Sequence, residues 1–119
     1  GPWKRAAGGG MAWYNRGIMR LNETQRRAIR DAVADHFGLD AVVLLFGSRV
    51  DDNSRGGDID LLVEVTDMRP DSAAATRAKL SAIADIQRRI GERKIDLVVA
   101  SPETDKPVVT NARRTGVAV

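Results

Sequence analysis

Residues 41–65 constrain the fold more than any other part of the sequence. They contain two short apolar runs, AVVLLF over 41–46 and IDLLVEV over 59–65, of the length and composition of buried strands. Only 12 residues separate Phe46 from Ile59. This connection is short for the crossover helix that parallel strands require, so we expect the two strands to be antiparallel neighbours.

The flanking sequence predicts helices. Asn22 followed by Gln25 has the spacing of a capping box, and the helix that begins there should end at Gly38. Asp71-Ser72 is a candidate cap for a longer helix. The remaining elements are expected as that helix over 73–90, a strand over 95–100, a short helix near 106–114 and a strand over 116–119. This order predicts an α/β domain in which helices flank a small mixed β-sheet.

The helices should face the core with apolar stripes of helical period. In the first helix, His36 lies on this stripe, and we expect it to be packed there rather than to bind metal, since it is the only histidine. The stripe of the first helix is Ile29, Ala32, Val33, His36 and Phe37, and that of the second is Leu80, Ile83, Ala84, Gln87 and Ile90.

Two aspartates at the start of the second strand need an explanation. Because side chains alternate in a strand, Asp58 and Asp60 share one face, opposite the face that carries Ile59 and Leu61. Their Cα atoms would be about 6.6 Å apart. Carboxylates at this spacing can converge on one hard cation such as Mg²⁺, or flank two. The alternative is a strand edge that carries acids in solvent.

A third acid strengthens the metal interpretation. Asp96 lies in KIDLVVA, again an acid within an apolar strand. If this strand is the neighbour of 59–65, Asp96 joins the same cluster of carboxylates. The alternative is that Asp96 forms an ion pair with Arg93 or Lys94.

Gly47-Ser48 ends the first strand. Such a turn can present backbone N–H groups and a hydroxyl to phosphate oxygens, although taken alone it could be an ordinary turn. Two other motifs do not fit. The run DDNSRG resembles the start of an EF-hand, but Arg55 replaces one ligand and Leu62 stands where the bidentate Glu belongs. The sequence has no P-loop motif.

Composition and charge limit the possible functions. The net charge of +3 comes entirely from Lys4, Arg5 and Arg16, so the rest of the chain is neutral and a poor candidate for non-specific nucleic-acid binding. Without cysteine, disulfides and thiolate metal sites are excluded. We expect residues 1–18 to be a flexible tag or extension, residues 19–119 to be the domain, and the protein to be cytoplasmic, since no signal peptide or membrane span is recognisable.

The run FGSRVDDNSRGGDIDLLVEV resembles the signature of the polymerase-beta-like nucleotidyltransferase superfamily, which has a Gly-Ser, a polar loop and then Asp-x-Asp. The aspartate of IDLVV matches the third carboxylate of that family. The opening MRLNETQRRAIRDAV resembles the minimal nucleotidyltransferases known as MntA-like antitoxins, and the resemblance extends over nearly all of 19–119. Gly57 departs from the pattern, because the family often has Ser before the first Asp.

The resemblance implies a mechanism and partners. Asp58, Asp60 and Asp96 would be the catalytic, metal-binding residues for two Mg²⁺ ions, and Gly47 and Ser48 would hold the triphosphate of ATP. Arg49 matches an arginine common at its position, where it would contact the triphosphate or form a surface ion pair. The acceptor would be a hydroxyl, that of a tyrosine, on a HEPN-domain ribonuclease toxin from the adjacent gene. Addition of AMP would then neutralise the toxin.

Two other functions remain open. The protein could be an antitoxin that masks its toxin sterically, in a hetero-oligomer and without catalysis. It could also transfer AMP to a small molecule such as an aminoglycoside. The intact acids Asp58, Asp60 and Asp96 argue against a site that has lost its activity.

Overall fold

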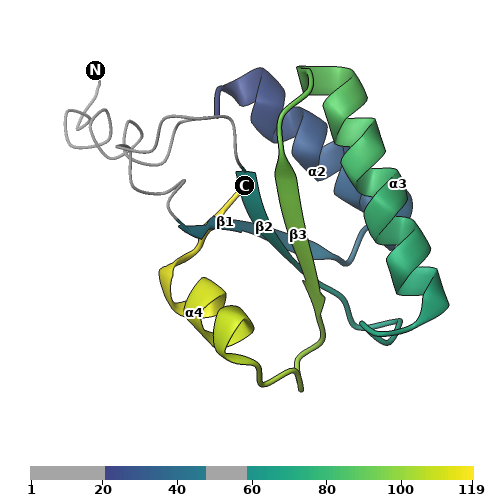
Figure 1. Ribbon diagram of the computed structural model, residues 1–119, viewed down its shortest axis with the longest axis vertical. Coiled ribbons are helices and arrows are strands. Elements are labelled where there is room, and N and C mark those ends of the chain that lie inside the picture. The colour runs from purple at the N-terminus through teal and green to yellow at the C-terminus, as the bar shows by residue number, and fades with distance from the viewer. Residues whose placement is uncertain (1–20, 48–58) are drawn as a thin grey trace.

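The computed structural model describes residues 21–47 and 59–119, which form one mixed sheet and three helices (Figure 1). The predicted order of elements is confirmed. The elements are α2 (Glu23–Phe37), β1 (Val42–Phe46), β2 (Ile59–Glu64), α3 (Ala73–Ile90), β3 (Ile95–Ala100), α4 (Pro107–Thr115) and β4 (Val117–Ala118).

The strands lie in the order β3-β2-β1-β4. The predicted antiparallel pairing of β1 with β2 is confirmed, and β4 also pairs antiparallel with β1. In contrast, β2 and β3 are parallel, with α3 as the crossover between them. Because one pair is parallel and two are antiparallel, the sheet is mixed, as the sequence predicts. The predicted α/β fold class is therefore correct.

Local signals set the helix ends where the sequence places them. At the start of α2, the Asn22 side chain accepts from the Gln25 N–H at 2.8 Å, and the Gln25 side chain accepts from the Asn22 N–H at 3.0 Å. Ser72 rather than Asp71 caps α3, since its hydroxyl accepts from the Ala75 N–H at 3.0 Å. These caps satisfy N–H groups that the first helical turn leaves without partners. Strand ends differ from the predictions by only one or two residues.

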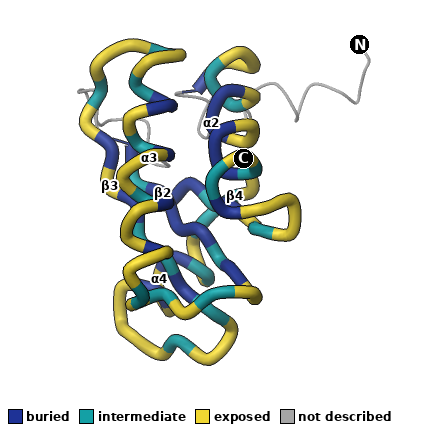
Figure 2. The backbone as a smooth tube through the Cα atoms, turned by 90° about the vertical axis from the view of Figure 1, so that its right-hand side faces the viewer, coloured by how far each residue is buried: buried dark blue, intermediate teal, exposed yellow. Residues whose placement is uncertain are grey.

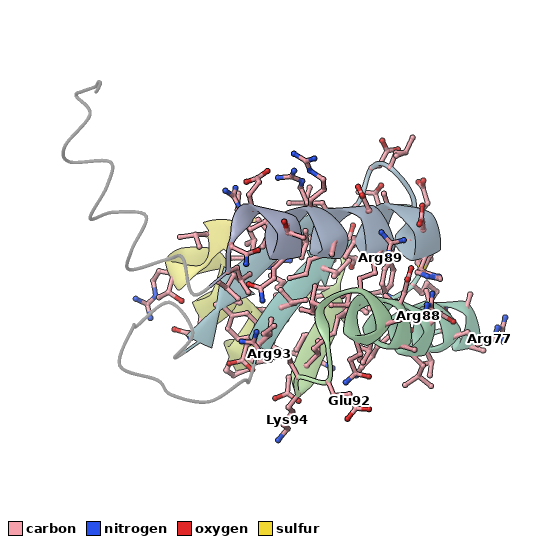
Figure 3. The ribbon with its side chains drawn as sticks, turned by 90° about the horizontal axis from the view of Figure 1, so that it is seen from above. Arg77, Arg88, Arg89, Glu92, Arg93 and Lys94 are labelled. Atoms are coloured by element: carbon pink, nitrogen blue, oxygen red, sulfur yellow. The ribbon has the colours of Figure 1, made fainter. Side chains whose placement is uncertain are left out.

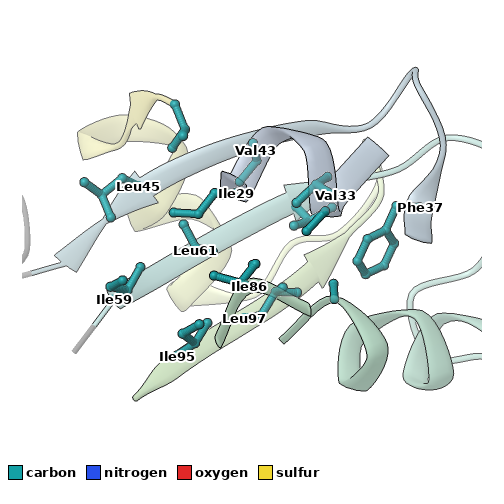
Figure 4. Close-up of a cluster of buried hydrophobic side chains, with 14 of the residues drawn as sticks. Ile29, Val33, Phe37, Val43, Leu45, Ile59, Leu61, Ile86, Ile95 and Leu97 are labelled. Atoms are coloured by element: carbon teal, nitrogen blue, oxygen red, sulfur yellow. The ribbon is translucent and has the colours of Figure 1, made fainter. Parts of the chain in front are cut away.

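The main core lies between one face of the sheet and the pair α2 and α3 (Figure 4). Odd-numbered residues of β2 and β3 supply this face, as the strand period predicts. Helix α2 contributes its predicted stripe, with the residues of its inner side buried and those of its outer side exposed (Figure 2). The largest fully buried side chains of this core are Ile29, Val33, Leu45, Ile59, Leu61, Val63 and Ile86.

A second, smaller apolar cluster lies on the opposite face of the sheet. Here α4 packs over even-numbered strand residues, and Leu62 is fully buried by it. Leu62 therefore faces away from the main core but is not exposed. The buried members of this second cluster are Phe46, Leu62, Ala100, Val109 and Ala112.

The stripe predicted for α3 is only partly correct: Ile83 and Ile90 pack at the edge of the main core, whereas Leu80 and Ala84 are exposed. Leu80, a member of that stripe, is 60% exposed, and Ile83, Gln87 and Ile90 are only half-buried. Small side chains fill the interface instead, because they let the helix approach its neighbours closely. The buried residues of α3 are Ala75, Ala78, Ala82, Asp85 and Ile86.

The hydrophobic pattern did not predict the buried face of α3 correctly because this face contains a charged residue, Asp85. Its oxygens accept from Arg88 at 2.8 Å and Arg89 at 2.9 Å, both on α3, and lie 3.1 Å from Nε2 of His36 on α2. The predicted packing of His36 at the stripe is confirmed. The hydrogen bond from Arg89 holds the pKa of Asp85 below its ordinary value, although burial acts in the opposite direction.

The described helices show no membrane span. Within residues 21–47 and 59–119, none is both long enough and apolar enough to cross a bilayer.

Candidate active site

Two of the three predicted acids lie side by side on adjacent strands. Asp60 of β2 is the register partner of Asp96 of β3, and Phe46 at the end of β1 is the register partner of Asp60. Because Ile59 and Ile95 point into the main core, both aspartates face the opposite side of the sheet, the side that carries α4. Asp60 is half-buried and Asp96 is exposed. The predicted neighbourhood of the two strands is confirmed, and it places Asp96 beside Asp60.

The parallel pairing of β2 with β3 brings these acids together. Both occupy the second position of their strands, and the ladder begins just before them, where the Ile59 N–H donates to the Lys94 carbonyl at 2.9 Å. The α3–β3 connection is tied to the helix, because Gln87 Nε2 donates to the Arg93 carbonyl at 2.9 Å. This bond holds the segment just before β3 against the end of α3.

Arg93 and Lys94 lie at this end of the sheet, beside the start of β3 (Figure 3). Among the described residues, Asp96 forms no ion pair with either of them. Its carboxylate remains exposed on the sheet face that it shares with Asp60.

Gly47 brings the backbone at the end of β1 close to Asp60. Its φ of +77° lies in the region that favours glycine. A side-chain carbon at this position would overlap Oδ2 of Asp60 and lie 3.2 Å from its Cγ. Any other residue would therefore displace either the turn or the carboxylate. Glycine is favoured at this position for two structural reasons, the backbone conformation and the closeness of Asp60.

The other predicted site residues lie outside the described residues. These are Asp58, Ser48 and Arg49, together with Gly57, where the sequence departs from the family pattern. The structure thus brings together Gly47, Asp60 and Asp96 and leaves the other assignments as predictions. Over residues 21–47 and 59–119, no group of three or more potential metal ligands is found.

Asp60 and Asp96 fit a divalent metal ion in their chemistry and placement. Neighbouring strands are about 4.8 Å apart, so two register partners on one face can turn their carboxylates toward a common ion. Carboxylate oxygens are the ligands that Mg²⁺ prefers, and the exposed position of Asp96 leaves room for the waters that Mg²⁺ retains. Asp58, which precedes β2, would supply the third carboxylate of the predicted set.

A small mixed sheet that presents paired carboxylates beside a close glycine turn is the architecture of a nucleotidyltransferase. The family model of the nucleotidyltransferase domain matches residues 26–118. The chain therefore belongs to this family, within the polymerase-beta-like superfamily, whose members generally use nucleoside triphosphates and divalent metal ions. No curated protein matches the chain.

Sequence reasoning missed the residues that lie beside this site on the same face of the sheet. It treated Phe46 only as part of an apolar run and gave no role to Arg113 of α4. The available signal was Glu64, an acid on the same face of β2 as Asp60, because a half-buried acid on a sheet usually has a cationic partner. In the structure, that partner is Arg113.

Proposed function

We propose that this nucleotidyltransferase moves AMP from ATP to a hydroxyl, that of a tyrosine, on a HEPN-domain ribonuclease toxin and thereby neutralises the toxin. The observation that carries the proposal is the register pairing of Asp60 with Asp96 in a chain of this family. The choice of acceptor is supported by the resemblance of residues 19–119 to MntA-like antitoxins. The exposed position of Asp96 supports a bulky acceptor that approaches from outside.

Each residue would have a defined part in the transfer. Asp60 and Asp96, with Asp58, would hold Mg²⁺, which when bound stabilises charge on both the attacking and the leaving oxygen. Gly47 would let a phosphate approach the backbone beside Asp60, with Ser48 and Arg49 as further phosphate contacts. The acceptor oxygen forms a bond to the α-phosphorus, the bond to the bridging oxygen breaks, and pyrophosphate leaves. Asp96 would orient the acceptor hydroxyl and accept its proton.

The test is the intact mass of the product of the adjacent gene after incubation with this protein, ATP and Mg²⁺. We expect additions of the mass of AMP, absent with the Asp58→Asn/Asp60→Asn double variant. Peptide mapping should place the additions on tyrosine.

Other outcomes would replace the proposal. A stable complex that silences the partner without any added mass would favour steric masking. No addition and no complex would direct the search to small-molecule acceptors such as aminoglycosides.

A further inference from the structure

Arg113 connects three parts of the chain that are distant in sequence. From α4, its Nε and Nη2 donate to Oε1 of Glu64 at 3.3 and 3.1 Å. Its Nη1 donates to the Thr104 carbonyl at 2.9 Å, and Nη2 donates also to the Ser101 carbonyl at 2.7 Å. One guanidinium thus ties α4 to the end of β2 and to the loop that follows β3, and both side chains of the ion pair are about 70% buried, at 30% and 27% exposure.

Helix α4 depends on such external contacts. It has nine residues, fewer than an isolated helix needs for stability in water, and its N-cap residue, Lys106, makes no side-chain capping bond. Only Val109 and Ala112 of this helix are buried. The rigid, planar guanidinium of Arg113, with four hydrogen bonds, is therefore the principal polar attachment of α4 to the sheet.

The surface that α4 covers leads directly to the active site. Val109 and Ala112 pack with Phe46, which is 8% exposed and is the register partner of Asp60. The next residue, Gly47, has no space for a side chain because Asp60 occupies it. A displacement of α4 would release the Phe46 ring and so change how closely the Gly47 backbone approaches the carboxylate.

We infer that Arg113 is a positioning residue for nucleotidyl transfer: it holds α4 against Phe46 and thereby fixes the approach of Gly47 to Asp60. Arg113 does not reach the reacting atoms. Its partner Glu64 is four residues along β2 from Asp60, roughly 13 Å away at the rise of a strand. The expected effect on transfer kinetics rests on the proposed function. The effect on the placement of Gly47 does not, since it can be measured without activity.

The kinetic experiment compares Arg113→Met and Arg113→Lys with Arg114→Met. Arg114 is the matched control, because it is the next residue of α4, is exposed and, within residues 21–47 and 59–119, uses its side chain only for a hydrogen bond to Asn111 of the same helix, at 2.9 Å. We expect the KM for ATP to rise by roughly tenfold in Arg113→Met, since small misplacements of binding groups are costly. Arg113→Lys should be intermediate because lysine keeps the charge but not the planar fork. Arg114→Met should be unchanged.

A purely structural role gives a different result. A less stable protein has fewer active molecules, which lowers kcat and leaves KM unchanged. If Arg113→Met lowers kcat alone, the inference is overturned while the proposed transfer stands.

A second measurement does not require activity. In ¹H–¹⁵N spectra, Arg113→Met should shift the amide signals of Phe46, Gly47 and Asp60, whereas Arg114→Met should shift only signals of α4. If Arg113→Met does not fold, Glu64→Gln gives the same test with the carbonyl contacts of Arg113 retained, and we expect smaller shifts of the same three amides. Unchanged amides would overturn the inference, even if the wild-type protein transfers no nucleotide.

Discussion

The two faces of this sheet differ in how completely helices cover them and in the residues that they carry. The face toward α2 and α3 is closed by helices of 15 and 18 residues, and its core includes fully buried side chains from α2, α3, β1 and β2. The face toward α4 is covered by a helix of nine residues and carries an exposed and a half-buried aspartate in one register row. The first face supplies stability, and the second uses this stability to hold carboxylates near solvent. The following substitutions test this division.

The largest effect is expected at the acids of the open face. Asp60→Asn keeps the size of the side chain but removes its charge, so metal binding and nucleotide transfer should fall below detection. The circular dichroism spectrum and cooperative unfolding should remain, because the closed face is untouched. Asp105→Asn, at another exposed acid near α4, is the control and should be active. An active Asp60→Asn variant would refute the assignment of the site.

Substitutions of two adjacent leucines of β2 measure how much each face of the sheet contributes to the free energy of unfolding. Leu61 lies in the main core and Leu62 lies under α4, and both are fully buried. Leu61→Ala should reduce the free energy of unfolding by about 3–4 kcal/mol, because the long helices cannot collapse into the cavity. Leu62→Ala should cost about 2 kcal/mol, since the short helix α4 can move inward. Urea unfolding measures both, and equal costs would show that the faces are equally rigid.

Substitutions of two glycines distinguish the effect of backbone strain from the effect of a side chain placed against the site. Gly47 and Gly38 both have positive φ, +77° and +107°, but only Gly47 would bring a side chain against Asp60. Gly47→Ala should reduce the rate of transfer by about a hundredfold, as expected when a catalytic contact is displaced. Gly38→Ala should cost about 1–3 kcal/mol of stability, because its backbone lies in a region that essentially only glycine adopts, and leave the rate unchanged. Similar losses of rate in both variants would mean that strain alone is responsible.

The smallest effect concerns the buried charge behind the closed face. Because Arg89 lowers the pKa of Asp85, the ionised carboxylate stabilises the fold at pH values above its ordinary pKa of 3.8, and this contribution is lost as pH falls through the lowered value. Asp85→Asn should cost about 1–2 kcal/mol at neutral pH. It should also lose less stability than the wild type on acidification below pH 3.8. Parallel curves of stability against pH for the two proteins would contradict this.

The sequence predicted the elements well because their signals are local. The Asn22–Gln25 capping box, the Ser72 cap and the alternation in β2 each act over a few residues, and each is found in the structure. The same local pattern failed for the buried face of α3, where Leu80 points to solvent and Asp85 is buried. A charge can be buried there only because Arg89 and His36 surround it, and His36 comes from another helix.

The candidate site shows the same limit. The residue types that could bind metal and phosphate could be recognised in the sequence, since Asp58 precedes an apolar strand, Asp60 and Asp96 interrupt apolar strands, and Gly47 follows one. The partnership of Asp60 and Asp96 in the sheet register could be recognised only in the folded protein, because the pairing of β2 with β3 depends on the α3 crossover between them. In the folded protein, α4 also supports the sheet positions of Asp60 and Asp96 through Arg113. Such contacts join residues far apart in the chain, so no short-range pattern contains them.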